Sequence, residues 1–242
     1  KSPKVGRTFV LDLMDGTADE YAELGDYELL VHDGTHRSMV EQIKAACAVP
    51  SDPAKPNVVI VDSATAWWNM LVEWADMRAR RGKANRATLA KDPDAEINIS
   101  MNIWNDAAGR WGEVALALKK FPGIGVITAQ GKEVSALDAS GAPIPNKKVW
   151  KVEAHKSLPA LVNAWVRMEK PHKATLIGVR SLRVEVPDKG LPLGTDGNVL
   201  ERVVFDILGA GQSFVADQSV APAPSEVAWD VLGWADQAEH DA

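Results

Sequence analysis

The sequence predicts an α/β protein built on a mostly parallel sheet flanked by helices, and two observations support this fold class. The first is the apolar, β-branched run Asn57-Val58-Val59-Ile60-Val61, which is typical of a strand buried on both faces between layers of helices. The second is the alternation of short apolar strands with longer amphipathic segments over residues 7–129. This alternation is the pattern of parallel strands joined by crossover helices.

Each expected element has a local signal in the chain. Strands are expected at residues 7–13, 27–31, 57–62 and 124–129, and helices at 38–48, 65–81 and 101–120. The proline-rich segment 49–56 is expected to be a loop, as is the polar stretch that extends to residue 98. Signals are weaker beyond residue 130. Residues 132–144 predict a hairpin or loop, 158–168 mix helix and strand preferences, 174–186 alternate as a strand, and 200–208 predict a last amphipathic helix.

Composition limits the class of protein. With 242 residues, a net charge of −6 and one cysteine, the chain fits one large α/β domain without a disulfide framework, so we expect a reducing cytoplasm. No apolar run is long enough to span a bilayer, and no membrane partner is expected. The acidic total argues against indiscriminate coating of nucleic acid but allows a local basic groove.

The C-terminal part differs in composition from the rest of the chain. Residues 1–211 are expected to form the core, whereas residues 212–242 are rich in Ala, Pro, Ser and Asp and predict a flexible acidic tail. Near its end the tail contains the short amphipathic segment Val227–Trp234. This segment fits either a partner-binding motif or a disordered terminus.

Asp62 is the leading candidate for a functional residue. It stands at the carboxyl end of the strongest predicted strand, and ligands of open α/β sheets bind at that edge. An acid at this point is how P-loop NTPases hold Mg²⁺. The alternative is a turn aspartate that caps the next helix.

Taken in order, these motifs resemble the RecA/DnaB ATPase superfamily, above all its small phage-encoded recombination and replication proteins. The matching elements are a strand ending in Asp12, Val61-Asp62-Ser63, Gly125–Gln130, Ala164–Met168 and Val179–Arg183. The resemblance covers residues 7–211 and implies a RecA-like fold. It also implies ATP and Mg²⁺ as cofactors and a homo-oligomer, with six subunits in DnaB-like rings.

The resemblance assigns roles to several residues. Asp62, with Asp12, would support Mg²⁺, Gln130 would sense the γ-phosphate, and Arg180 and Arg183 would reach the nucleotide of a neighbouring subunit. The family's water-positioning glutamate is replaced by Met14, and Asp15 is the nearest substitute. Two exposed arginines on an edge strand are the structural alternative for Arg180 and Arg183.

The phosphate-binding motif Gly-x-x-x-x-Gly-Lys-Ser/Thr of this superfamily does not occur in residues 1–242. We expect it to lie upstream of Lys1; the alternative is that it has been lost.

Two basic clusters fall where the family has its DNA-binding loops. The first contains Arg78, Arg80, Arg81, Lys83 and Arg86, and the second contains Lys132, Lys147, Lys148, Trp150, Lys151 and Lys156. Lysine and arginine neutralise phosphates, and an interleaved aromatic ring stacks on bases. Solvated charged surface is the alternative for each cluster.

The remaining aromatic and histidine residues favour structural roles. Trp67, Trp68, Trp74, Trp104 and Trp111 have helical spacing that suits a core or a subunit interface, and the histidines show no metal-ligand spacing with Cys47.

The sequence therefore predicts a nucleotide-dependent protein that binds single-stranded or forked DNA in phage-type recombination or replication, in the cytoplasm of the bacterial host. Two alternatives stay open. In one, Asp12, Asp15 and Asp62 bind two metals and the chain is a structure-specific DNA nuclease. In the other, it is a non-catalytic assembly scaffold.

Overall fold

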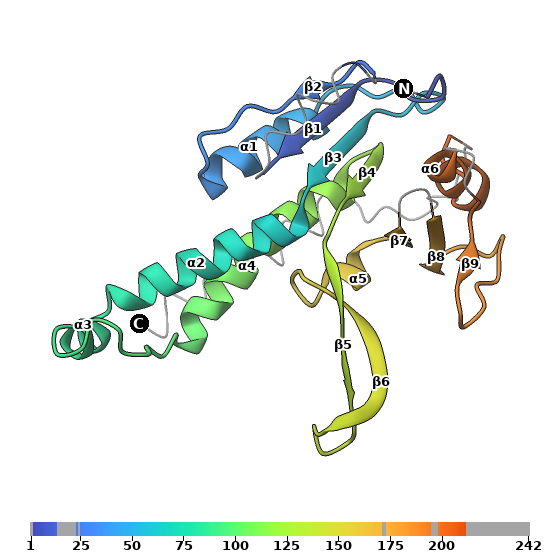
Figure 1. Cartoon of the computed structure of the whole chain (residues 1–242). Coiled ribbons are helices and arrows are strands. Elements are labelled where there is room, and N and C mark those ends of the chain that lie inside the picture. The colour runs from blue at the N-terminus through green and yellow to red at the C-terminus, as the bar shows by residue number, and fades with distance from the viewer. Residues whose placement is uncertain (1, 14–22, 24, 171–172, 195–197, 212–242) are drawn as a thin grey trace, which may run out of the picture. The chain divides into compact units, whose positions relative to one another are not determined.

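The computed structural model describes residues 2–13, 23, 25–170, 173–194 and 198–211. Figure 1 shows the arrangement of its helices and strands. The N-terminal elements are β1 (Thr8–Asp12), β2 (Glu28–Leu29), α1 (His36–Cys47), β3 (Val58–Asp62), α2 (Ala64–Arg80), α3 (Lys83–Leu89), α4 (Met101–Lys120) and β4 (Ile124–Ile127). They are followed by β5 (Gly131–Leu137), β6 (Pro143–Val152), α5 (Leu158–Leu161), β7 (Ala164–Lys170), β8 (Lys173–Val179), β9 (Leu191–Pro192), α6 (Val199–Glu201) and the π-helical segment η2 (Arg202–Ile207).

The predicted parallel sheet is confirmed. Its four strands lie in the order β2-β1-β3-β4, and every neighbouring pair is parallel. Asn57 fixes the entry into β3, because its buried side chain accepts a hydrogen bond from the Arg7 backbone and donates to the carbonyls of Val49 and Pro50. The chain is therefore a mixed α/β protein with crossover helices, as the β-branched strand runs predict.

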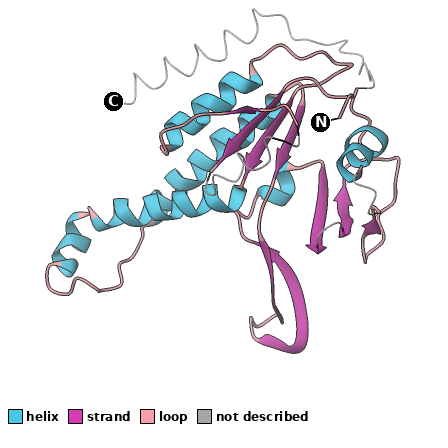
Figure 2. Ribbon diagram, turned by 45° about the horizontal axis from the view of Figure 1, so that its top comes forward, coloured by secondary structure: helices cyan, strands magenta, loops and turns pink. Residues whose placement is uncertain are grey.

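One face of the sheet carries the main core. The odd-numbered side chains Phe9, Leu11, Val59 and Val61 are buried there, beneath α1, α2 and α4. Trp67, which has no exposed surface, lies at the centre of this core. Figure 2 shows the helices beside the parallel strands.

The opposite face of the sheet is only partly covered. Val10, Ile60 and Val126 form part of the floor of a cleft of about 450 Å³, and Leu200, Val204 and Phe205 from α6 and η2 line it as well. We call this space the sheet-face cleft. Its acidic lining residues are Asp12, Asp26, Asp62 and Glu201, and none of its described lining residues is a lysine or arginine.

Beyond residue 130 the structure departs from several sequence-based expectations. Residues 131–152 form one long antiparallel hairpin, β5 and β6, which confirms the hairpin alternative for residues 132–144; the hairpin extends through the basic residues 147–151, which were expected in a loop. The strand expected at 174–186 ends at Val179, and Arg180 and Arg183 follow it outside any strand. Earlier in the chain, the polar stretch before residue 98, which was expected to be a loop, contains the short helix α3. Strands β7, β8 and β9 form a separate antiparallel sheet.

This second sheet has a small core of its own. Ala174, Leu176 and Leu193 are buried against Val203 and Ile207 of η2. The expected last helix is therefore present, and its apolar side faces β8.

Residue contacts divide the chain into two units, 1–211 and 212–242. The predicted acidic tail and the segment Val227–Trp234 lie outside the described residues, as do Met14 and Asp15. Within the described part of the chain, no helix is both long and apolar enough to cross a membrane.

Candidate functional site

Asp12 and Asp62 meet at the carboxyl edge of the parallel sheet. They end β1 and β3 as direct register partners, and both line the sheet-face cleft. The Asp62 side chain is exposed, and its Oδ1 accepts a hydrogen bond of 2.5 Å from the Thr128 hydroxyl. The cap of α2 is Ser63, whose hydroxyl accepts from the Ala66 backbone at 3.2 Å. Asp62 is thus not the helix cap, and its carboxylate stays at the sheet edge.

Gln130 connects this edge to the hairpin. Its backbone N–H donates to the Thr65 hydroxyl at 2.9 Å, and its carbonyl accepts from the Glu153 N–H at 2.9 Å. Its exposed position follows directly after Thr128 and Ala129, and β5 begins at the next residue, Gly131. Gln130 therefore joins the start of α2 to the start of the hairpin.

The two carboxylates at the sheet edge suit a Mg²⁺ ion bound together with a nucleotide better than the two-metal site of a nuclease. A Mg²⁺ ion that bridges nucleotide phosphates needs only one or two protein carboxylates, and Asp12 and Asp62 supply two. Among the described residues, no group of three or more His, Cys, Asp and Glu side chains is arranged to hold a metal ion. The nuclease hypothesis also requires Asp15, whose position is not described, and it stays a prediction.

A larger groove lies between α4, the hairpin and the second sheet. Its volume is about 1310 Å³. We call it the cationic groove, because its described lining residues include five cations and no carboxylate. The cations are Lys148, Lys151, Lys156, Arg167 and Arg180, and four tryptophans line it as well: Trp68, Trp104, Trp150 and Trp165.

The groove brings together part of the second predicted DNA cluster. Lys148, Trp150, Lys151 and Lys156 all line it, as does Arg180, which donates to the Ala160 carbonyl at 2.8 Å. Two members of the cluster do not line it. These are Lys132, which forms an ion pair with Glu153, and Lys147.

Several residues of this groove have no predicted ligand role. Asn105 and Asn163 line it without any sequence signal, Trp165 and Arg167 were expected only as part of the matching element Ala164–Met168, and Trp68 and Trp104 were expected only to pack. These residues come from α2, α4, β7 and the turn before β7, which are distant in sequence. A single cation in a short strand gives no local signal, and only the tertiary arrangement reveals it.

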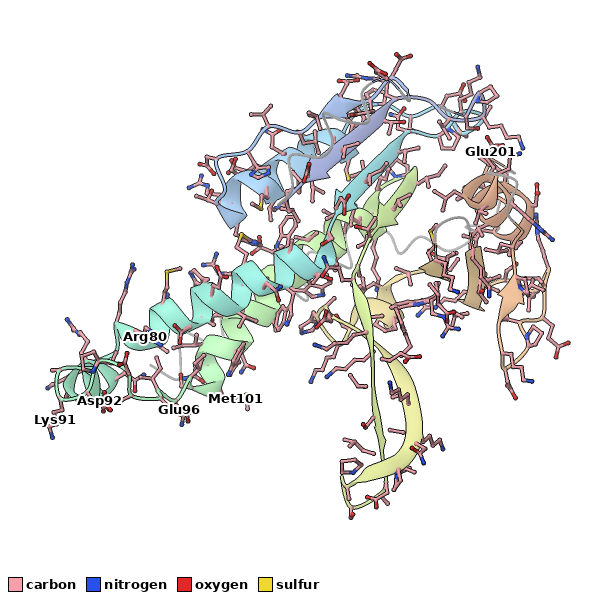
Figure 3. All side chains as sticks on the ribbon, viewed as in Figure 1. Arg80, Lys91, Asp92, Glu96, Met101 and Glu201 are labelled. Atoms are coloured by element: carbon pink, nitrogen blue, oxygen red, sulfur yellow. The ribbon has the colours of Figure 1, made fainter. Side chains whose placement is uncertain are left out.

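The first predicted DNA cluster lies elsewhere, at the end of α2 and on α3, and lines neither cleft. Arg78 pairs with Asp106 at 3.7 Å, and Arg80 pairs with Asp76 at 2.6 Å. Figure 3 shows Arg80, Lys91, Asp92 and Glu96 together at this end of the molecule, so both signs of charge occur there. The remaining members of the cluster are exposed: Arg81, Lys83 and Arg86.

Arg183 packs against the end of η2. A Cβ atom at Gly209 would lie 2.7 Å from the guanidinium of Arg183, and Arg183 Nη1 lies 3.5 Å from the Asp206 carbonyl.

Cys47 is half-buried, and burial raises the pKa of its thiol to about 11, which suits packing and not nucleophilic chemistry.

Two histidines are held in aromatic surroundings. His36 accepts from Trp67 Nε1 through its Nδ1 at 3.3 Å, and its Nε2 lies 3.7 Å from a Glu113 oxygen. His155 lies edge-on to Trp68, with 4.7 Å between the ring centroids. Burial lowers the pKa of both imidazoles; Glu113 opposes this effect at His36, and Lys156 adds to it at His155.

We therefore expect the chain to lose stability as the pH falls below 6.5, the ordinary histidine value. In that range the unfolded chain binds protons that the folded chain does not, so the free energy of unfolding must rise with pH. Urea unfolding between about pH 7.5 and about pH 5.5 measures this, above the range in which carboxylates titrate. The double variant His36→Gln/His155→Gln should show a flatter dependence, and an unchanged slope would contradict the assignment.

Comparison of the chain with protein-family models, with curated proteins and with solved structures yields no match. The site must therefore be interpreted from its own geometry.

Proposed function

We propose that this chain is a nucleotide-dependent DNA-binding protein of the RecA/DnaB type that acts in phage-type recombination or replication. The observation that carries the proposal is the cationic groove, with five cations, four tryptophans and no described carboxylate in its lining. The net charge of the protein is −6, so its overall composition does not predict a locally positive surface of this kind. Phosphates pair with the cations, and the indole rings offer stacking surfaces for bases.

The three lysines of the groove are available to a ligand, whereas Arg167 pairs with Glu169 and Arg180 donates to the Ala160 carbonyl. Lys148 has only a long, exposed pair with Glu133, at 3.7 Å, and such surface pairs contribute little stability. Lys151 and Lys156 are also exposed on the groove wall. A polyanion can therefore displace the weak internal pair at little cost.

The sheet edge supports the nucleotide part of the proposal. Asp62, beside Asp12 and hydrogen-bonded to Thr128, is suited to hold Mg²⁺ against nucleotide phosphates. When bound there, Mg²⁺ would neutralise charge that develops during phosphoryl transfer. The chain's own contribution is to fix the two carboxylates by strand register and to hold Asp62 against Thr128, which lies just before Gln130 and the hairpin.

The proposal includes assembly into a homo-oligomer, with Arg180 and Arg183 as the cations offered to a neighbouring subunit's nucleotide. Arg180 lines the groove, so its side chain is also suited to a DNA phosphate. Light scattering on the full chain distinguishes the two roles. A strict monomer with full activity would leave Arg180 only the DNA role.

The direct test is DNA binding by the full chain, measured by anisotropy of a labelled oligothymidylate at several salt concentrations. If all five cations contact phosphates, the logarithm of the binding constant should fall with the logarithm of salt concentration with a slope of about −3.5. No binding at low salt would overturn the proposal.

Asp62→Asn tests the nucleotide part. The variant keeps the shape of the side chain but not its charge, so Mg²⁺-dependent ATP hydrolysis should fall by about a hundredfold or more, while the melting temperature and DNA binding measured without nucleotide stay unchanged. Asp92→Asn, an exposed carboxylate outside both clefts, is the control for the lost charge. Full hydrolysis in Asp62→Asn would remove Asp62 from the site, and metal-dependent DNA cleavage without hydrolysis in the parent would favour the nuclease.

A further inference from the structure

Trp150 is held in one position on the wall of the cationic groove. It lies on β6, on the same face of the hairpin as Gly131 of β5, since Gly131 pairs with Val152 two residues further along. A Cβ atom added to Gly131 would lie within 2.9 Å of three atoms of the Trp150 indole. The ring therefore packs directly on the glycine backbone, a close approach that only glycine permits.

A cation lies near the same ring. The Arg167 guanidinium on β7 is 6.0 Å from the centroid of the Trp150 indole, and its Nη2 donates to Glu169 at 2.9 Å. Its Nε is buried and has no hydrogen-bond partner among the described residues. The pair with Glu169 holds the guanidinium near the indole.

The Trp150 side chain nevertheless keeps exposed surface. It is 37% exposed and lines the groove together with Arg167. An aromatic ring that is fixed by its neighbours and still open on one side loses little freedom when a ligand stacks on it, so part of the entropic cost of binding is avoided.

We propose that Trp150, positioned by Gly131 and Arg167, is a preformed platform for one unpaired base, and that the groove thereby selects single-stranded over duplex DNA. This inference rests on the proposed DNA-binding function and specifies its substrate. In a duplex, both faces of a base are occupied by its neighbours, so only an unstacked base can lie on the indole. The Arg167 guanidinium, which is partly exposed beside the ring, then lies near the same nucleotide and can pair with its phosphate.

Three labelled probes of equal length separate stacking from charge: oligothymidylate, the same backbone without bases, and the corresponding duplex. The unaltered chain should bind oligothymidylate about tenfold or more tightly than the abasic strand, because stacking on an aromatic residue contributes this much per base. Trp150→Ala should remove most of this advantage of oligothymidylate over the abasic strand, because Trp150 is the most exposed of the four tryptophans, and Trp150→Phe should recover part of it. The salt dependence should be the same in all three proteins, since the phosphate contacts remain.

Gly131→Ala tests the positioning role without removing the ring, because the added methyl group must displace the indole. This variant should lose the same advantage of oligothymidylate over the abasic strand as Trp150→Ala loses. Gly125→Ala on β4 is the matched control, since its Cβ would meet only Leu118 Cδ2 at an ordinary 3.9 Å, and its binding should not change. Melting temperatures establish that each variant is folded. Arg167→Gln should weaken oligothymidylate binding more than Arg167→Lys does, because only the lysine variant keeps the positive charge.

The outcomes are distinguishable. Equal affinity of the unaltered chain for oligothymidylate and the abasic strand, or unchanged binding in Trp150→Ala, overturns this inference and leaves the proposed function standing. Tighter binding of the duplex also overturns it. Absence of binding to any of the three probes overturns the proposed function, and this inference with it.

Discussion

Replacing Lys148, Lys151 and Lys156 together by alanine will weaken binding of single-stranded DNA about a hundredfold at about 0.1 M salt. The three ammonium groups line the cationic groove and project from β6 and the segment that follows it. Each phosphate contact contributes about 0.7 to the salt slope on single strands, so the slope should become shallower by about 2. Anisotropy titrations of the full chain at several salt concentrations measure both quantities.

The matched control is the triple variant Arg78→Ala/Arg80→Ala/Arg81→Ala. It removes the same number of positive charges from the other predicted cluster, where two of the arginines already pair with Asp106 and Asp76. We expect only a small loss of affinity and nearly the parental salt slope. Equal losses in the two variants would mean that net charge, and not the groove, governs binding.

Trp67→Ala will destabilise the fold by about 3–5 kcal/mol. The indole has no exposed surface, packs between α1 and the sheet, and donates through Nε1 to His36. Truncation leaves a large cavity and removes a buried hydrogen bond, and both effects act in the same direction. Urea unfolding should show a lower midpoint with an unchanged m-value.

Trp150→Ala serves as the comparison for the same chemical change at an exposed position. Its indole is 37% exposed and lies outside the main core, so the loss should be no more than about 1 kcal/mol. If the two substitutions cost the same, Trp67 does not have the central packing role that its burial indicates.

The parallel sheet was predictable because its signals are local. Val58–Val61 are β-branched and apolar, and α2 follows with helical periodicity. Parallel strands end at a common edge, so the proximity of Asp12 and Asp62 follows from the order of the strands alone.

The length of the hairpin and the formation of the groove could not be predicted in the same way. Nearly every residue of β6 is exposed, and its Pro-Asn-Lys-Lys sequence resembles a loop, because its pairing with β5 and not burial makes it a strand. The groove needs α4, β6, β7 and β8 to come together, and Arg167 acquires its significance only from its position near Trp150. Local patterns carry no information about such contacts.

The sheet-face cleft affects how the stability of this protein should be measured. Environment-sensitive dyes report unfolding because apolar surface normally becomes accessible only when tertiary packing is lost. Here Val10, Ile60 and Val126 already offer such a surface in the folded chain. An uncharged dye such as Nile red will therefore fluoresce before any heating, and its signal will fall, not rise, as the cleft is lost. Circular dichroism follows the transition without this artefact.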